Sequence, residues 1–485
     1  MRVPNKKFAC CLLLSGVLLS IVLSCNKTST GRTVTVNSFT PDSGNAGTRV
    51  TITGSGFSGT AANDSVAVDG VLASIVSATT TQIVFTMPAD PLSIDSALIT
   101  VLIQGAIVPV GFFHYPAPTP PPPPNQQDVS TFAGSGTPGA ANGKGAAASF
   151  NRPEGGVFDK QGNLYVADYG NNEIRKIDTA GNVTTYAGTG QPGFGNGSAT
   201  TATFKNPSGI AIDNHGNLFV TDQGNNAIRM IDPNGNVTTV AGSGAAGAHD
   251  APGVNATFNS PIGLGVDTLG GNIFVGDANN NEIRVINIAS GNVMTYAGST
   301  SSGSTDAIIP TGYPQMASFN GPRGLTVIAQ GTANLYSLYI FVADYYNNKI
   351  REIYTTSGNQ TVVLTLAGNQ NNSAGFLNSE PASFSSPNGT AWGYSKNVNG
   401  PVEFFIADAG NHAIRYSQSD PTSDHAYDMP MLTLAGTGSS GLVNGTYAQA
   451  QFNYPDGVAF NPVDGNLYVM DFSNNVIRKI ILQPE

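Results

Sequence analysis

The stretch DYGNNEIRKID, residues 168–178, occurs in five further versions along the chain, and this repetition decides the fold. A motif that occurs six times is more typical of a repeated structural unit than of a single site. Asp and Asn accept left-handed backbone conformations and cap turns with their own side chains. The stretch is therefore expected to form a tight turn between two strands. The other versions are DQGNNAIRMID from Asp222, DANNNEIRVIN from Asp277, DYYNNKIREIY from Asp344, DAGNHAIRYSQ from Asp408 and DFSNNVIRKII from Asp471.

Each version contains one Asp at its start and one Arg seven positions later. We expect the arginines to pair with carboxylates or carbonyl groups inside or between the repeats, because a buried cation without a partner is costly. The alternative is a ring of Asp or Arg side chains that binds an anion. The residues are Asp168, Asp222, Asp277, Asp344, Asp408 and Asp471, with Arg175, Arg229, Arg284, Arg351, Arg415 and Arg478.

Working outward from the motif, each repeat shares further segments. A Phe followed by Pro-x-Gly comes first, then a segment such as NLYVAD, then the motif, and then a segment such as VTTYAG. Four short apolar runs per repeat predict four antiparallel strands. Such a sheet has two apolar faces and needs neighbours on both sides. Radial stacking of four-stranded sheets gives a β-propeller, so we predict an all-β fold class.

The two ends of the repeat region complement each other. The sixth repeat stops after NVIRKIILQPE and has no last strand, whereas an unmatched DVSTFAG, residues 128–134, precedes the first repeat. We therefore predict a six-bladed β-propeller that is closed by its N-terminal strand. The repeats resemble NHL repeats through Gly, N-L-Y-V-x-D and N-x-I-R. Propellers of that family bind proteins, RNA or small molecules, and a few are enzymes, so the resemblance implies a fold more than a function.

The region before the repeats reads as a separate small β-domain. VTITGSGF, VAVDGV and QIVFTM show near-alternating apolar residues bounded by turn residues. The segment SFTPDSGNAGTRVTITGSGFS resembles the start of IPT/TIG domains, through residues such as Ser38, Pro41, Gly44, Gly54 and Phe57. The resemblance implies an immunoglobulin-like β-sandwich that serves as a spacer or interaction module.

The N-terminus reads as a targeting segment. Arg2, Lys6 and Lys7 precede an apolar stretch over residues 8–23. The sequence VLSC, which ends at Cys25, resembles the lipobox of bacterial lipoproteins. This implies export and a lipid on Cys25 that anchors the protein to the outer membrane, on a side that the sequence leaves open. The alternative is an ordinary secretory signal.

These observations predict five parts. A signal peptide over 1–24 is followed by a tether over 25–33, the sandwich over 34–115, a proline-rich linker over 116–127 and the propeller over 128–485. The formal net charge is −10 and only 11% of the residues are charged. No basic face is available to neutralise phosphates, which argues against a nucleic-acid partner.

Two groups of residues are candidates for a binding site. Tyr169, Tyr345, Tyr346 and Phe472 follow the turn Asp and are expected on the propeller face that carries the long Gly-rich insertions. Exposed aromatic side chains there could stack on sugar rings or anchor a protein. The alternative is ordinary packing against the loops.

The second group is the residue between Pro and Gly, expected at the mouth of the central channel. These residues are Glu154, Ser208, Ile262, Arg323, Asn388 and Asp456. Blades one and six are neighbours, so Glu154 and Asp456 are expected to lie close together. PEGGVFD is loosely similar to the Glu-Gly start of strand one in gluconolactonase-like propellers, which implies a divalent metal, and Ca²⁺ is the candidate. The alternative is a pair of solvated turn acids.

The preferred function is non-catalytic binding of a glycan or protein at the cell envelope, through the loop-rich face. The rival is a metal-dependent hydrolase or lactonase that uses Glu154 and Asp456, and a third possibility is a structural envelope scaffold. The histidines occupy different places in their repeats, so a shared zinc site is not expected.

Overall fold

The computed structural model describes residues 34–44, 47–60, 64–68, 71–88, 96–103, 106–114, 128–307, 314–332, 335–355, 361–378, 382–394, 402–417 and 431–482. The chain divides into two compact units between Pro121 and Pro122. The expected signal peptide, Cys25, the tether and the proline-rich linker lie outside the described residues.

The first unit is a seven-stranded antiparallel sheet that curls onto itself. The strand order is β1-β2-β5-β4-β3-β6-β7. Residues from both halves of the sheet, such as Ile52 on β2 and Val101 on β6, share one buried cluster. The two edge strands also meet, since a Cβ at Gly111 of β7 would lie 2.6 Å from the Phe39 ring of β1. The predicted immunoglobulin-like unit is confirmed. The strands are β1 (Thr35–Thr40), β2 (Arg49–Ser55), β3 (Asp64–Val68), β4 (Val71–Ala78), β5 (Gln82–Thr86), β6 (Ser96–Ile103) and β7 (Ala106–His114).

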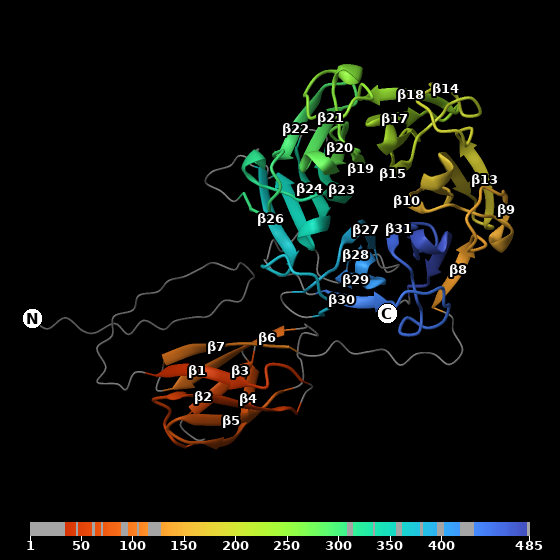
Figure 1. Cartoon of the computed structure of the whole chain (residues 1–485). Coiled ribbons are helices and arrows are strands. Elements are labelled where there is room, and N and C mark those ends of the chain that lie inside the picture. The colour runs from red at the N-terminus through yellow and green to blue at the C-terminus, as the bar shows by residue number, and fades with distance from the viewer. Residues whose placement is uncertain are drawn as a thin grey trace, which may run out of the picture. The chain divides into compact units, whose positions relative to one another are not determined.

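The second unit is a six-bladed β-propeller, as predicted, and Figure 1 shows the innermost strand of each blade around the centre. The strands of the first three blades, from the centre outward, are β10 (Pro153–Phe158), β11 (Leu164–Asp168), β12 (Glu173–Ile177) and β13 (Asn182–Ala187); β15 (Pro207–Ile212), β16 (Leu218–Asp222), β17 (Ala227–Ile231) and β18 (Asn236–Ala241); β19 (Pro261–Asp267), β20 (Asn272–Asp277), β21 (Glu282–Asn287) and β22 (Val293–Gly298). The strands of the other three are β23 (Pro322–Thr332), β24 (Leu335–Asp344), β25 (Lys349–Thr355) and β26 (Thr361–Gly368); β27 (Pro387–Tyr394), β28 (Val402–Asp408), β29 (Ala413–Ser417) and β30 (Leu432–Ala435); β31 (Pro455–Phe460), β32 (Leu467–Asp471), β33 (Val476–Ile480) and β8 (Val129–Ala133).

The ring closes through β8, which comes before blade one in the chain but forms the outer strand of blade six. It pairs antiparallel with β33, with Val129 opposite Ile480 and Ala133 opposite Ile477. The prediction of an N-terminal closing strand is therefore confirmed. Two short strands from the insertions, β9 (Gly143–Lys144) and β14 (Gly197–Ser198), add a fifth strand to blades one and two, beyond the four that the repeat pattern predicts.

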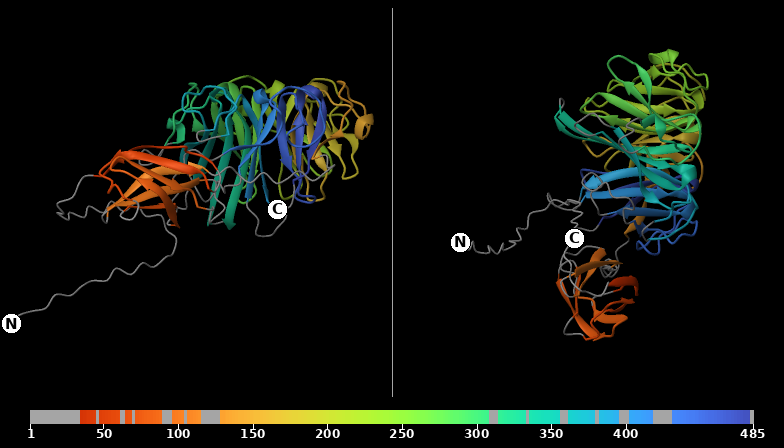
Figure 2. Two further views of the ribbon diagram at one scale, coloured as in Figure 1. Left: turned by 90° about the horizontal axis from the view of Figure 1, so that it is seen from below. Right: turned by 90° about the vertical axis from the view of Figure 1, so that its left-hand side faces the viewer.

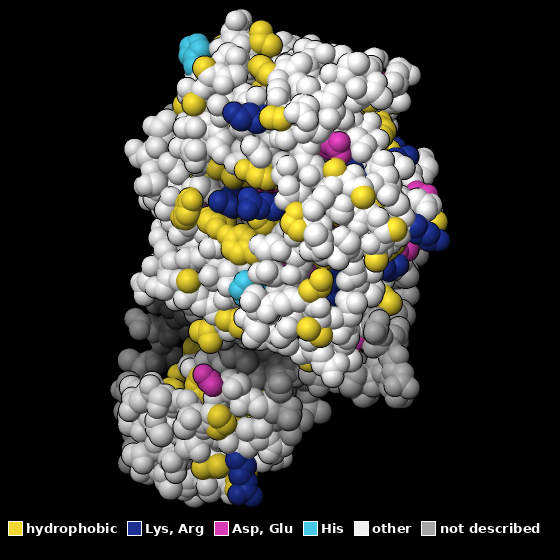
Figure 3. Space-filling view, turned by 45° about the vertical axis from the view of Figure 1, so that its right-hand side comes forward, with side chains coloured by type: hydrophobic (Ala, Val, Ile, Leu, Met, Phe, Trp, Pro, Cys, Tyr) yellow, Lys and Arg dark blue, Asp and Glu magenta, His cyan; other side chains and the backbone are white. Residues whose placement is uncertain are grey.

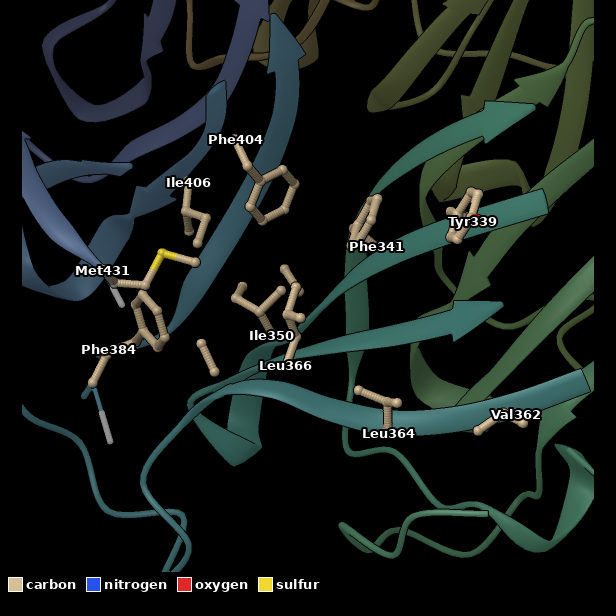
Figure 4. Packing of buried hydrophobic residues seen from close by; sticks show 13 residues of the cluster. Tyr339, Phe341, Ile350, Val362, Leu364, Leu366, Phe384, Phe404, Ile406 and Met431 are labelled. Carbon is tan, nitrogen blue, oxygen red and sulfur yellow. The ribbon is translucent and has the colours of Figure 1, made fainter. Parts of the chain in front are cut away.

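Each blade buries both of its faces against its neighbours. In β11, Leu164 and Val166 join a cluster shared with blade six, whereas Tyr165 and Ala167 join one shared with blade two. Figure 4 shows the corresponding packing between blades four and five, where Phe341 faces Phe404. Side views show the blades standing side by side around the ring (Figure 2). The alternating apolar residues of NLYVAD thus hold two interfaces at once, which is why one blade needs two neighbours.

The repeated motif forms a short 3₁₀ turn that is held by a buried ion pair. In blade two, Asp222 accepts hydrogen bonds from the Lys205 backbone at 2.7 Å, from Asn225 at 2.8 Å and from Arg229 at 2.7 Å. Arg229 also donates to the Thr203 carbonyl at 3.0 Å. The turns are η2 (Tyr169–Asn171), η3 (Gln223–Asn225), η5 (Ala278–Asn280), η7 (Tyr345–Asn347), η8 (Ala409–Asn411) and η9 (Phe472–Asn474), and three more 3₁₀ turns are η1 (Gly145–Ala147), η4 (Gly253–Asn255) and η6 (Pro314–Met316).

The same pair recurs in every blade. Both side chains are fully buried each time, and the repeated Phe lies against the guanidinium, as Phe204 does with its ring centroid 5.2 Å from Arg229. The other pairs are Arg175–Asp168 at 2.8 Å, Arg284–Asp277 at 2.9 Å, Arg351–Asp344 at 3.0 Å, Arg415–Asp408 at 2.9 Å and Arg478–Asp471 at 2.9 Å.

The residue after each turn links one blade to the next. Asn226 adopts a left-handed conformation with φ of 47°, and its side-chain oxygen accepts the backbone N–H of Ser260 in blade three at 2.9 Å. Asn475 of blade six accepts the N–H of Arg152 in blade one at 3.0 Å, so these links also cross the closure. In blade five His412 takes this place, and burial lowers the pKa of its imidazole, which accepts a hydrogen bond through Nδ1.

Replacement of Arg229 tests the turn. Arg229→Ala should lower the free energy of unfolding by about 3–5 kcal/mol, because Asp222 would remain buried without its cation. Arg229→Lys should recover only part of this, since an ammonium lacks the fork that reaches several acceptors. Calorimetry or urea denaturation measures both. The exposed Lys160→Ala is the control, and a loss in Arg229→Ala no larger than in this control would contradict the account.

Closure by β8 is tested at Val129, whose side chain is 0% exposed. Val129→Asp should destabilise the propeller by roughly 3 kcal/mol or more, because it buries a charge without a partner in the strand that joins the ends of the ring. Ser130→Asp, at a partly exposed neighbouring position, should cost far less. Equal melting temperatures for the two variants would argue against a structural role for β8.

Candidate functional site

The six Pro-x-Gly segments begin the innermost strands and pack against one another around the ring. A Cβ at Gly155 would lie 2.4 Å from the Ser208 carbonyl oxygen, and one at Gly324 would lie 2.2 Å from that of Asn388. No side chain fits at that separation, so the glycines are required by close approach of the blades. Since Pro153 pairs with Asp168, the residues between Pro and Gly lie at the same end of the propeller as the repeated turns. We call this end the mouth.

One side of the mouth is internally satisfied. Ser208 of blade two shares a hydrogen bond of 2.9 Å with Thr221, and Thr221 donates to the Ile262 carbonyl at 2.6 Å. Ser208 and Ile262 are buried. This side therefore offers little to a ligand. The charged residues Arg323, Asp456 and Glu154 lie on blades four, six and one, and the amide Asn388 lies on blade five.

Glu154 of blade one and Asp456 of blade six are buried, so the alternative of two solvated turn acids is wrong. Burial raises the pKa of Asp456 to about 7, against the opposing effect of Arg323. Burial, with the charge of Asp456 added to it, also raises the pKa of Glu154 well above its ordinary value. Among the described residues no hydrogen-bond donor contributes to either pKa, in contrast to Asp168, which three residues stabilise by hydrogen bonds. The two acids thus face the mouth without the donors that a buried carboxylate needs.

Arg323 of blade four extends over the ring of Tyr345, and its guanidinium carbon lies 3.5 Å from the ring centroid. Burial opposes the charge on Arg323, but Asp456, Tyr345 and Glu154 outweigh it and raise the pKa of the guanidinium. Tyr345 is only 9% exposed, which corrects the expectation of an exposed aromatic at this position. Its hydroxyl contacts that of Tyr454, which lies two blades away.

Further aromatic side chains continue from this contact around the two acids. The rings of Tyr454 and Phe472 lie 6.4 Å apart, and those of Phe472 and Tyr169 lie 6.3 Å apart. Arg152 of blade one lies over Phe472, with its guanidinium carbon 6.0 Å from the ring centroid. We call Tyr345, Tyr454, Phe472 and Tyr169 the aromatic arc.

Tyr346 lies outside this arrangement. Its side chain is 59% exposed, and its ring meets that of Tyr345 edge-on at 4.8 Å. Of the four aromatics expected to be exposed, Tyr346 therefore fits, Tyr345 is buried, and Tyr169 and Phe472 are half-buried.

Among the described residues, Nδ2 of Asn388 in blade five and Nε of Arg323 are buried in the mouth without a hydrogen-bond partner. The Nε atoms of the six turn arginines share this property, so Asn388 is the group that distinguishes the mouth. Asn388 is only 2% exposed and occupies the same Pro-x-Gly position as the two acids. A buried donor without an acceptor costs free energy, so its persistence points to a ligand that supplies the acceptor.

Sequence reasoning missed Tyr454 and Arg152. Both precede the Pro of a Pro-x-Gly segment and have positive φ, of 55° and 57°. The equivalent residues elsewhere are small or amides, namely Asn206, Ser260, Gly321 and Ser386. The sequence does contain a signal for these two residues. Each is a large aromatic or cationic residue at a position that carries Asn, Ser or Gly in the other repeats.

The mouth does not suit Ca²⁺. This ion prefers six to eight oxygen ligands. The mouth offers two carboxyl groups, which are fewer oxygen ligands than this ion needs, and the guanidinium of Arg323 already balances one of the two charges. Within the described residues no group of three or more His, Cys, Asp and Glu could hold a metal ion.

Figure 3 shows one face of the molecule with its side chains coloured by type. On the propeller, dark blue Lys or Arg side chains are bordered by yellow side chains, a class that includes Tyr and Phe. None of the described helices is long and apolar enough to span a bilayer.

Comparison with known families accounts for both units. Residues 34–115 match the IPT/TIG domain, residues 150–177 match the NHL repeat, and residues 190–253 match the Teneurin NHL domain. The chain therefore carries an IPT/TIG domain followed by a propeller of NHL repeats.

Relatives share the propeller region. NHL repeat-containing protein 2 of Homo sapiens is 27% identical over 349 residues, which are 66% of this chain and 45% of that protein. SUPPRESSOR OF QUENCHING 1 of Arabidopsis thaliana, a chloroplastic protein, is 28% identical over 310 residues, which are 60% of this chain and 26% of that protein. The chain thus spans less than half the length of these curated relatives.

Solved structures from Bacteroides species share this fold over most of the chain. An auxiliary nutrient binding protein from Bacteroides thetaiotaomicron has a TM-score of 0.53 at 16% identity, covering 92% of this chain and 97% of that one. An auxiliary nutrient binding protein from Bacteroides ovatus has a TM-score of 0.53 at 16% identity, covering 94% and 98%. At these identities the likeness establishes the fold alone.

The raised pKa of Asp456 predicts how stability depends on pH. The folded state holds this proton more tightly than the unfolded state, whose pKa is near 3.8, so the free energy of unfolding falls as pH rises from roughly 4 to 7. Asp456→Asn removes this loss. Its melting temperature should match that of the parent near pH 4 and exceed it by about 2 °C or more at pH 8.

Differential scanning calorimetry across this pH range measures the effect. Asp178→Asn is the control, because Asp178 lies in an exposed turn and hydrogen bonds from Asn182 lower its pKa. If Asp456→Asn melted below the parent at pH 8, Asp456 would be a structural acid with a partner.

Proposed function

We propose that this protein is an exported binding protein that holds a glycan at the mouth of its propeller. The observation that carries the proposal is the set of unsatisfied groups there. Among the described residues, Nδ2 of Asn388 and Nε of Arg323 lack acceptors, and no hydrogen-bond donor lowers the pKa of Glu154 or Asp456. A ligand that satisfies all of them must both donate and accept hydrogen bonds over a short distance.

A saccharide has this chemistry. Each hydroxyl group donates and accepts, and a sugar ring presents apolar C–H groups that pack on aromatic faces. The aromatic arc supplies such faces beside the acids. A concave site lined by aromatic rings with a few convergent polar groups is the usual form of a small-ligand site.

The fold neighbours agree with a binding role, since both are described as auxiliary nutrient binding proteins of Bacteroides species. The N-terminal sequence supports export and a lipid on Cys25, which would anchor the protein to the outer membrane. The alternative is a protein ligand that binds to the insertion loops, where the exposed Tyr346 could contact it.

A second candidate function is hydrolysis without a metal ion. Two neighbouring acids whose pKa values are both raised can divide the roles of general acid and base, which require a pKa near the working pH. Release of sugar from a saccharide that binds, abolished in Glu154→Gln, would favour this function over simple binding.

The binding proposal predicts that soluble oligosaccharides raise the melting temperature of the full chain, because they stabilise only the folded state. For a saccharide that does so, Asn388→Leu and Arg323→Met should weaken the affinity by about tenfold or more, since each removes a buried donor. Isothermal titration calorimetry measures the affinities.

Two controls locate the site. Lys160→Ala removes a cation from the β10–β11 turn, at the opposite end of the blade, and should leave binding unchanged. Tyr346→Ala should also leave it unchanged if the ligand lies in the mouth. Loss of binding in Tyr346→Ala, with full binding in Asn388→Leu, would move the site to the insertion loops.

A further inference from the structure

The deep part of the mouth has an excess of acid. Glu154 and Asp456 are both buried there, and Arg323 is the cation whose charge acts on both. The guanidinium is held over the Tyr345 ring at 3.5 Å, and the contact between Tyr345 and Tyr454 fixes the ring in turn. Arg323 is therefore held in place at the side of the mouth. Its single positive charge balances one of the two carboxyl groups, so the other has no counterion when both are ionised.

Tyr454, Phe472 and Tyr169 of the aromatic arc continue past these acids, since the charge of Asp456 acts on the hydroxyls of both Tyr454 and Tyr169. These rings follow one another at 6.4 Å and 6.3 Å, from Tyr454 through Phe472 to Tyr169. The hydroxyl of Tyr169 experiences the charges of both Glu154 and Asp456, so the last ring of the arc is also close to the acids. Aromatic faces and carboxylates together favour a cation, because the ring quadrupole and the negative charge act in the same direction.

Asn388 supplies an independent sign of a ligand at the same place. Its unpartnered Nδ2 requires an acceptor, which an ammonium group does not have. The ligand must therefore combine a cationic group with a hydroxyl or carbonyl oxygen within the reach of one small molecule.

We propose that the mouth selects a saccharide that carries a protonated amino group, with the ammonium between Glu154 and Asp456 and a neighbouring hydroxyl on Asn388. This inference rests on the proposed glycan-binding function and specifies its ligand class. The amino group compensates the second acid, and the sugar ring packs on the aromatic arc.

The test uses matched sugars that differ only at the amine. Isothermal titration calorimetry of the full chain compares the diamine disaccharide of β-1,4-linked glucosamine with its di-N-acetyl form, and glucosamine with glucose. The proposal expects the amine forms to bind roughly tenfold more tightly or better, which corresponds to about 1.4 kcal/mol.

Two variants test whether the preference for the amine form depends on the two acids. Asp456→Asn and Glu154→Gln should bind the amine and N-acetyl forms with nearly equal affinity, and Asp178→Asn should keep the parent's preference. Equal binding of amine and neutral sugars by the parent would overturn this inference and leave glycan binding standing. Absence of binding by every sugar tested would overturn both.

Proton release is a second readout when it is compared between the amine and N-acetyl forms, because hydrogen bonds from a neutral sugar also lower the pKa of a carboxyl group. An ammonium placed between the acids lowers their pKa values, so binding near pH 7 should release a proton, seen as a heat that depends on the ionisation enthalpy of the buffer. The other titratable groups around the acids are Arg323 and Tyr345 on blade four, Tyr454 on blade six and Tyr169 on blade one. Arg152 of blade one lies over Phe472, and its charge acts on Tyr169. A buffer-independent heat in the parent would contradict the placement of the amine.

Discussion

The buried ion pair between the Asp and Arg of each turn is the constraint on which the propeller depends. Burial disfavours the charge on the Asp, and the guanidinium, the turn Asn and a backbone N–H offset part of that penalty, as for Asp168, whose pKa is still raised to about 6. The Arg then ties the insertion loop to the turn through backbone carbonyls, as Arg229 does at Thr203 and Gly195. Asn226, which lies between Asp222 and Arg229 in the chain, accepts a hydrogen bond from the following blade. The turn that each ion pair holds therefore also links its blade to the next one.

This scaffold explains why the mouth can hold groups that are costly on their own. Six glycines allow the innermost strands to pack closely against one another, as at Gly389, where a Cβ would lie 2.5 Å from the Asp456 carbonyl oxygen. The backbone of the residues between Pro and Gly is therefore fixed at the mouth. Asp456 and Glu154 are thus held buried without hydrogen bonds, and Asn388 without an acceptor. Strain of this kind persists where the surrounding structure over-determines it, and it is concentrated at functional sites.

The repeats allowed the fold to be predicted, including closure by β8, because each blade repeats the same local chemistry and the missing strand left a visible gap. The mouth was only partly predictable. The order of the blades predicts that Glu154 and Asp456 are neighbours, but their burial depends on side chains from other blades. Tyr345 appeared to be a loop aromatic, since the stacking of Arg323 over it has no counterpart in the other repeats. Tyr454 and Arg152 occupy a position that is Asn, Ser or Gly in the other four repeats.

The central claim is that the unpaired groups of blades four, five, six and one form the ligand site. The most direct measurement is a crystal structure of the full chain with the saccharide that binds best. The account predicts density for a sugar against the aromatic arc, with one oxygen within hydrogen-bonding distance of Asn388 Nδ2 and the deeper end between Glu154 and Asp456. A sugar bound on the insertion loops, with Asn388 and both acids unchanged and without contact, would contradict it.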